Sequence, residues 1–240
     1  SVTTQGNEAG PVNVVYTVAL SSANNTGAPI TFDLVDLGTG TATSGSDYVA
    51  IPAAAKISVA NGATTGTFTV AVLDDALLEP TETVIAKISN PSNTAVTFTT
   101  DTAAASILSN ETATAALSVT TQGNEAGPVN VVYTVTLSSA NNTGASITFD
   151  LVDLGTGTAT SGHDYTAIPA AAKISVANGA TTGTFAVAVL DDALLEPTET
   201  VIAKISNPSN PAVTVPAAAD TATANIFNSD KVAPTADIGD

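Results

Sequence analysis

The sequence contains no cysteine, no methionine and no tryptophan, and its only histidine is His163. Without cysteine the chain can form neither a disulfide framework nor a thiolate metal site. A single histidine excludes a zinc site built from several imidazoles and argues against histidine-based catalysis. A metal site in this chain must therefore be built from oxygen ligands.

Positive charge is also scarce. The chain of 240 residues has no arginine, and 5 lysines face 22 acidic residues, for a formal net charge of −17. This balance argues against partners that carry phosphates, both nucleic acids and anionic membrane surfaces. No run of about 18 apolar residues is present, so we expect no direct membrane insertion.

Charged residues make up 11% of the chain and apolar residues 44%, and Val, Thr, Ala and Gly outnumber the long helix formers. That mixture is typical of pleated sheets. The chain starts at Ser1 and carries no signal peptide. Together with the composition, this leads us to expect a processed piece of an exported, extracellular or cell-surface protein.

The sequence repeats itself at domain length. Residues 1–96 align without gaps on residues 118–213, and only six of the 96 pairs differ. A unit of this size is an independent domain rather than a solenoid repeat. We expect domains over 1–111 and 112–230 and a linker or tail over 231–240. Residues 113–117 have no equivalent in the first copy, which predicts a shorter opening strand there.

Within each copy, apolar and polar residues alternate with a period of two, for example over 12–20, 30–35, 68–72 and 84–88. Breakers such as Asn61-Gly62 separate these runs and are typical of tight hairpin turns. About seven short strands in each copy predict an all-β fold: two tandem immunoglobulin-like antiparallel β-sandwiches.

The expected strand directions bring acidic residues from several loops to one end of each sandwich. In the first copy these residues are Glu8, Asp47, Asp74, Asp75, Glu79, Glu82 and Glu111. At an effective dielectric near 20, two carboxylates about 4 Å apart repel by about 4 kcal/mol, so a cation or protonation must offset the charge. Hard oxygen ligands in flexible loops favour Ca²⁺ over Mg²⁺, which demands a tighter octahedron.

Two motifs also carry a family resemblance. Gly40-Thr-Ala-Thr-Ser-Gly-Ser-Asp47-Tyr48 and Val72-Leu-Asp74-Asp75-Ala-Leu-Leu-Glu79-Pro-Thr-Glu82 resemble the Calx-β domain of sodium/calcium exchangers and bacterial surface proteins. Glu8, within Asn7-Glu-Ala-Gly, is similar to the glutamate after the family's first strand. The resemblance implies calcium ligands at Glu8, Asp47, Asp74, Asp75, Glu79 and Glu82, and in the second copy at Glu125, Asp164, Asp191, Asp192, Glu196 and Glu199.

Two features depart from the exchanger pattern. Ala76 stands where the exchanger has a third aspartate, and the acidic triplet after the last strand is reduced to Ser109-Asn110-Glu111 and Asn228-Ser229-Asp230. We keep Glu111 and Asp230 as candidate ligands and expect one or two ions per domain. Asp36 and Asp153 are possible outer groups of the site, whereas Tyr48 and Tyr165 are expected to be packing residues.

Several functional hypotheses remain open. The acidic end could be a solvated rim that favours solubility. Two nearby carboxylates also occur in glycosidases, but tryptophan for sugar stacking is absent, so we expect no enzyme. The leading hypothesis is a calcium-binding spacer of an adhesin-like protein, in which Ca²⁺ stiffens the domains and their junction with neighbouring domains. The alternatives are an adhesion module for a protein or glycan and a calcium-sensing regulatory pair.

Overall fold

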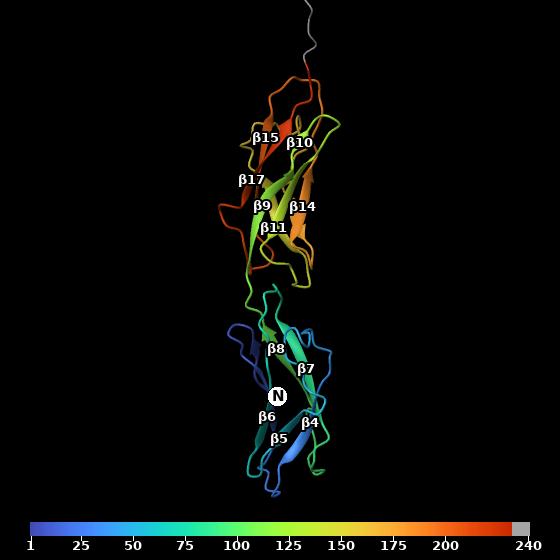
Figure 1. Cartoon of the computed structure of the whole chain (residues 1–240), viewed down its shortest axis with the longest axis vertical. Helices are drawn as coiled ribbons and strands as arrows, with labels where there is room; N and C mark the ends of the chain where they lie inside the picture. Colours follow the sequence, from blue (N-terminus) through green and yellow to red (C-terminus); the bar gives the residue numbers. More distant parts are fainter. Residues whose placement is uncertain (232–240) are drawn as a thin grey trace, which may run out of the picture. The chain divides into compact units, whose positions relative to one another are not determined.

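The computed structural model describes residues 1–231 of the chain, which divide into two compact units, Ser1–Glu111 and a second that begins at Thr112. Both are built from strands (Figure 1). The predicted all-β fold is confirmed. Of the predicted tail, everything after Lys231 lies outside the described residues. None of the described chain forms a helix that is long and apolar enough to span a membrane.

The first unit contains two facing sheets. One has three strands in the order β1-β3-β6: Val2–Thr4, Val14–Ala19 and Thr65–Val70. The other has five strands in the order β2-β8-β7-β4-β5: Gly6–Asn7, Thr102–Leu108, Glu82–Ser89, Ile30–Asp36 and Lys56–Val59.

The second unit repeats this arrangement with one addition. Its five-stranded sheet has the order β10-β17-β15-β12-β13: Gly123–Asn124, Thr221–Phe227, Glu199–Ser206, Ile147–Asp153 and Lys173–Val176. Its other sheet has the order β14-β11-β9-β16: Thr182–Val187, Val131–Leu137, Ala113–Thr121 and Val213–Thr214. β9 has 9 residues where β1 has 3, and β16 has no counterpart among the strands of the first unit.

The alternating sequence pattern places the core between the sheets. Inward side chains such as Val14, Phe32 and Ile57 are buried, while their sequence neighbours face solvent. Tyr16 crosses the core and donates its hydroxyl proton to the carbonyl oxygen of Val84 at 2.8 Å. A buried hydroxyl needs such a partner, so this bond also fixes the distance between the two sheets.

The opening segment of the first unit forms two short strands in different sheets. It changes sheets at Gln5: β1 pairs antiparallel with β3, and β2 pairs parallel with β8. The Gln5 side chain accepts a hydrogen bond from the Ser106 amide at 2.6 Å and so stabilises the crossing. At Gly6 a Cβ atom would lie 2.9 Å from Val72 and 3.0 Å from Ile107, so only glycine fits the crossing without movement of those side chains.

A difference from the prediction concerns the next strand, which begins at Val14 rather than at the predicted Val12. Val12 instead exchanges backbone hydrogen bonds with Asn7, at 2.7 and 3.0 Å. This short bridge turns the chain sharply after β2 and leaves Glu8 within the turn.

Candidate metal centre

Five segments supply the acidic residues of the first unit. Glu8 follows β2, and its amide donates to the carbonyl oxygen of Leu108 at 3.0 Å, which places it beside the end of β8. Glu82 opens β7 opposite Ile107 of β8. The loop between β4 and β5 contributes Asp47, the loop between β6 and β7 contributes Asp74, Asp75 and Glu79, and Glu111 follows β8. Because β2, β7 and β8 are neighbours in one sheet, their acidic ends lie side by side.

The loop after β4 is held against β7, and this contact positions Asp47. A Cβ atom on Gly40 would lie 2.0 Å from the carbonyl oxygen of Thr83, so the loop can approach β7 this closely only with glycine. The Ala42 amide donates to the same carbonyl at 3.0 Å. Asp47 is 3% exposed, and one of its carboxylate oxygens accepts a hydrogen bond from the Thr43 amide. The other carboxylate oxygen of Asp47 takes no part in this bond and is available to a ligand.

Tyr48, beside Asp47, packs into the core and donates its hydroxyl proton to the Asp36 carboxylate. The second oxygen of Asp36 accepts from the Gly38 amide at 2.9 Å. In the second unit Tyr165 and Asp153 repeat the pair at 2.5 Å. Asp36 and Asp153, which the sequence indicated as possible outer groups of the site, therefore each accept a hydrogen bond from a tyrosine and close a turn. The Asp-x-Gly spacing is a signal for such a turn.

The loop before β7 brings Asp75 and Glu79 to Asp47. The Asp75 side chain accepts from the Leu77 amide at 2.7 Å and so closes a turn. One carboxylate oxygen from each of Asp47, Asp75 and Glu79 lies within 4.8 Å of the other two. Two oxygens that share a calcium ion at about 2.4 Å are at most about 4.8 Å apart, so the spacing is compatible with one ion.

The second unit contains two such groups. One consists of Asp164, Glu196 and Glu199, and the other consists of Glu125, Asp191 and Asp230; in both, the carboxylate oxygens lie within 4.8 Å of one another. The Ser229 amide donates to Glu125 at 3.2 Å and draws the chain after β17 toward the site.

Burial and mutual repulsion raise the pKa values of the glutamates. Burial, with the neighbouring carboxyl of Glu111, raises the pKa of Glu8 to about 7. Burial and then Asp47 raise the pKa of Glu82 to about 8, and the same two causes raise that of Glu79 to about 6. Each shift means that the folded site, without a cation, disfavours the ionised form of the glutamate.

The second unit repeats these shifts. Burial, followed by Asp164, raises the pKa of Glu199 to about 7. Burial also raises the pKa of Glu125, against a smaller opposing effect of the Ser229 amide, and the pKa of Glu196, near Asp192.

The composition of the site fits a hard divalent cation. Oε2 of Glu8 and Oδ2 of Asp230 are buried and have no hydrogen-bond partner among the described residues. The four salt bridges found within residues 1–231 pair four of the five lysines with aspartates outside these groups: Lys56–Asp33, Lys87–Asp101, Lys173–Asp150 and Lys204–Asp220. Buried carboxylate oxygens without a donor are the ligands that a calcium ion requires.

The structure brings most of the predicted acidic residues into contact with one another, but not all of them. Electrostatic contact in the first unit joins Glu8, Asp47, Asp75, Glu79, Glu82 and Glu111. Asp74 belongs to no carboxylate group in the described part of the first unit, whereas its counterpart Asp191 does. In the second unit all seven predicted acids interact: Glu125, Asp164, Asp191, Asp192, Glu196, Glu199 and Asp230. Their roles as ligands stay a prediction.

The known structures to which the chain is similar include a calcium binding domain. The calcium binding domain CBD12 of CALX1.1 is 15% identical and covers 89% of this chain and 93% of its own, with a TM-score of 0.37. CBD12 from CALX1.2 is 17% identical, with coverages of 89% and 92% and a TM-score of 0.37. The apo-form Calx CBD1 domain is 21% identical over 50% of this chain and 100% of its own, with a TM-score of 0.38.

No curated protein sequence matches the chain. The Calx-beta domain family, in contrast, matches twice, over residues 3–113 and 118–230. These two segments contain all the motifs on which the resemblance rested, and the resemblance is confirmed. The chain belongs to the Calx-beta domain family and consists of two tandem copies of that domain.

Proposed function

We propose that each unit binds Ca²⁺ at its acidic end and that the chain is a calcium-binding structural module of a larger exported or cell-surface protein. The observation that carries the proposal is the buried carboxylate oxygen of Glu8, which has no donor among the described residues and lies among further acids. Membership in the Calx-beta family supports calcium as the ion. No step of this role requires catalysis.

The geometry supports two calcium positions in the second unit, one at each carboxylate group. One group joins the loop after β12 to the loop before β15. The other joins the end of β10 to the chain after β17. Calcium would cross-link segments distant in sequence, because each group draws ligands from at least two of them. Binding to the folded form alone at 100 times the Kd adds about 2.7 kcal/mol of stability.

The role of a stiffened module follows from this cross-linking. Without calcium the loops repel one another, and with calcium they are tied together. That calcium also stiffens the junction between neighbouring domains stays a prediction, which small-angle scattering with and without calcium would test. The exported, adhesin-like setting is likewise a proposal and rests on the composition.

Isothermal titration calorimetry with calcium tests the proposal. Asp47→Asn combined with Asp164→Asn removes a buried carboxylate of a group in each unit while preserving shape. We expect the affinity for calcium to fall at least about tenfold, since a charged ligand is lost. The matched control is Asp33→Asn with Asp150→Asn, which removes the same charge at lysine-paired surface sites. Absence of calcium binding by the unaltered chain, or equal losses in both variants, would refute the proposal.

A further inference from the structure

Each unit contains one Asn-Gly pair, Asn61-Gly62 in the first and Asn178-Gly179 in the second. The pair lies between β5 and β6 in the first unit and between β13 and β14 in the second, and both of its residues are exposed. The two flanking strands belong to different sheets. The turn therefore joins the two sheets of a sandwich instead of closing a hairpin of paired strands.

The turn has the geometry of a type II β-turn. The Ala63 amide donates to the carbonyl oxygen of Ala60 at 3.0 Å. Gly62, the third residue of the turn, has a φ of 85°, whereas the φ of Asn61 is not positive. A type II turn requires a positive φ at its third position, which explains the glycine after the asparagine. The second unit repeats the turn, with a φ of 80° at Gly179.

An Asn-Gly pair carries the atoms for a reaction with itself. The glycine amide nitrogen, once hydroxide removes its proton, attacks the side-chain carbonyl carbon Cγ of the asparagine. A bond forms between this nitrogen and Cγ, the bond between Cγ and Nδ2 breaks, and ammonia leaves with a proton from water. Water then opens the resulting five-membered imide at either of its two carbonyl carbons and leaves aspartate or isoaspartate. Glycine favours this attack because it has no Cβ atom to obstruct the approach.

In the folded first unit, hydrogen bonds from the segment 24–28 hold both reacting groups. The Gly62 amide, which is the attacking group, donates to the backbone carbonyl oxygen of Asn24 at 2.5 Å. The side-chain oxygen of Asn61 accepts from the Gly27 amide at 2.8 Å. We call these two bonds the turn clasp. While the clasp is closed, the nitrogen keeps its proton in a hydrogen bond and the carboxamide cannot turn freely.

Asn24 is a buried anchor for the turn clasp, and it is 2% exposed. Its side-chain nitrogen donates to the carbonyl oxygens of Ala28 and Val59 at 2.9 and 3.0 Å. Its side-chain oxygen accepts from the Thr26 hydroxyl at 2.7 Å. All the hydrogen-bonding groups of this side chain are thus paired, which fixes the backbone carbonyl that receives the glycine amide.

The second unit repeats the turn clasp and its anchor. The Gly179 amide donates to the backbone carbonyl oxygen of Asn141 at 2.5 Å, and the side-chain oxygen of Asn178 accepts from the Gly144 amide at 2.8 Å. The Asn141 side chain makes the same three bonds as that of Asn24. Because both units form these contacts, the turn clasp belongs to the fold of the domain.

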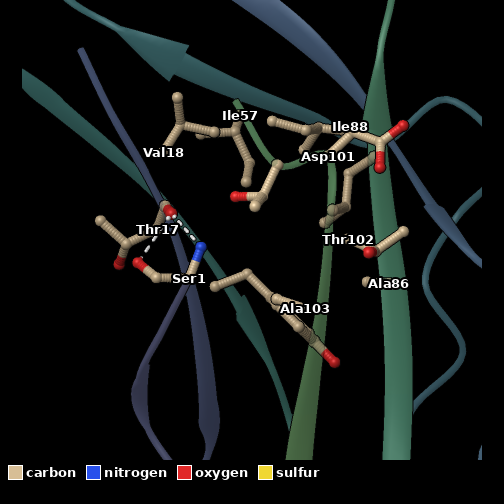
Figure 2. A pocket seen from close by; sticks show the side chains of 12 residues that line it. Ser1, Thr17, Val18, Ile57, Ala86, Ile88, Asp101, Thr102 and Ala103 are labelled. Atoms are coloured by element: carbon tan, nitrogen blue, oxygen red, sulfur yellow. Dashed lines mark hydrogen bonds between the residues drawn. The ribbon is translucent and has the colours of Figure 1, made fainter. Parts of the chain in front are cut away.

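The strands on both sides of the turn are held in place independently of it. Ile57 of β5 is 1% exposed and lines a small cavity together with Val18 and Ile88 (Figure 2). On the other side, a Cβ atom at Gly66 of β6 would lie 2.2 Å from the carbonyl oxygen of Ser58, so β6 passes directly against β5. Opening of the turn is therefore a local event between two anchored ends.

We propose that Asn61 and Asn178 are sites of self-modification, converted to aspartate and isoaspartate by the neighbouring glycine amide and water, and that the turn clasp confines this reaction to the moments when the turn is open. Isoaspartate carries the main chain through the former side chain and lengthens it by one methylene group. The turn cannot re-form around that longer backbone, so each such conversion removes one turn clasp permanently. The acidic loops precede β5 and follow β6, so the reaction involves none of the acidic groups.

The test incubates the full chain at pH 8 and follows both pairs by peptide mapping with mass spectrometry. The reference is the peptide Ser-Val-Ala-Asn-Gly-Ala-Thr, which has the sequence of both turns. We expect both pairs of the folded chain to react at least about tenfold more slowly than the peptide, because only the open turn reacts. Equal rates in the folded chain and in the peptide would overturn the proposal.

A pair of variants separates the turn clasp from folding in general. Asn24→Ala with Asn141→Ala removes both anchors and should raise the rate at both pairs at least about threefold. The matched control is Asn25→Ala with Asn142→Ala, which replaces the adjacent asparagines, whose side chains make none of the bonds of the turn clasp. Its rate should equal that of the unaltered chain.

Thr26→Val with Thr143→Val is a milder change, which removes a single bond to each anchor and replaces the alanine variant if that variant does not fold. Hydrogen exchange of the Gly62 and Gly179 amides, measured by NMR on the same samples, reports how often each turn opens. The rate of conversion should rise in proportion to that exchange. A variant whose glycine amides exchange faster without faster conversion would overturn the proposal.

Discussion

Replacing the buried glutamate of each unit, by Glu8→Gln with Glu125→Gln, is expected to stabilise the calcium-free protein and to weaken its response to calcium. The folded site raises the pKa of Glu8 from its ordinary 4.5 to about 7. Each tenfold change in acidity corresponds to about 1.4 kcal/mol, so ionised Glu8 destabilises the calcium-free first unit at pH 8 by about 3 kcal/mol. Glutamine keeps the shape and removes that charge.

For a domain of about 100 residues, 1 kcal/mol shifts the melting temperature by about 4 °C, so we expect the melting temperature of the first unit to rise by about 10 °C without calcium. Scanning calorimetry at pH 8, in metal-free buffer and in excess calcium, measures both effects. The rise in melting temperature produced by calcium should be smaller in the variant, because a ligand is missing. The raised pKa of Glu125 predicts a change in the same direction for the second unit.

The control for this experiment is Asp33→Asn with Asp150→Asn. These aspartates pair with lysines at the surface, and exposed pairs contribute about 0–1 kcal/mol. The control should be slightly less stable, with a full response to calcium. The reasoning fails if glutamine at positions 8 and 125 lowers the melting temperature in metal-free buffer, or if the response to calcium is the same in all proteins.

Three further predictions concern pH, backbone packing and the tyrosine contact. Carboxyls such as Glu82, whose pKa rises to about 8, hold their protons longer in the folded than in the unfolded chain, so calcium-free stability should fall from about pH 4.5 to about pH 8; thermal melts across that range would contradict this if stability rose. Gly40→Ala places Cβ 2.0 Å from the Thr83 carbonyl and should cost about 3 kcal/mol or more in chemical denaturation. Tyr48→Phe loses the bond to Asp36 and should cost about 1 kcal/mol, with calcium affinity within about threefold of the original chain; a larger loss of affinity would place Asp36 in the site.

Much of this architecture could be predicted because the relevant physics is local in sequence. The alternation through Val14, Tyr16 and Val18 predicts a half-buried strand, and the same pattern recurs in both copies. Strand directions then indicate which loops share an end, and this places Asp47 near Glu79 before any contact is known. Repulsion among acids that the strand directions bring together is the reason to expect a cation there, which stays a prediction.

What could not be predicted depends on contacts between distant residues. The opening strand changes sheets because Gln5 reaches Ser106 and because Gly6 fits between side chains of both sheets. Alternation along the chain carries no information about such a crossing. Residue type likewise does not decide between adjacent aspartates: Asp75 joins Asp47 and Glu79 in the first unit, whereas Asp191, the counterpart of Asp74, joins Glu125 and Asp230 in the second.

The two copies show why identical residues do not guarantee identical packing. Leu20 and Leu137 stand in nearly identical sequences, yet only Leu137 is buried. Its cover is the added length of β9, since Leu137 pairs with Ala115. In a sheet, the burial of a side chain depends on whether the neighbouring strand extends past it, and that strand is remote from the residue's own sequence context.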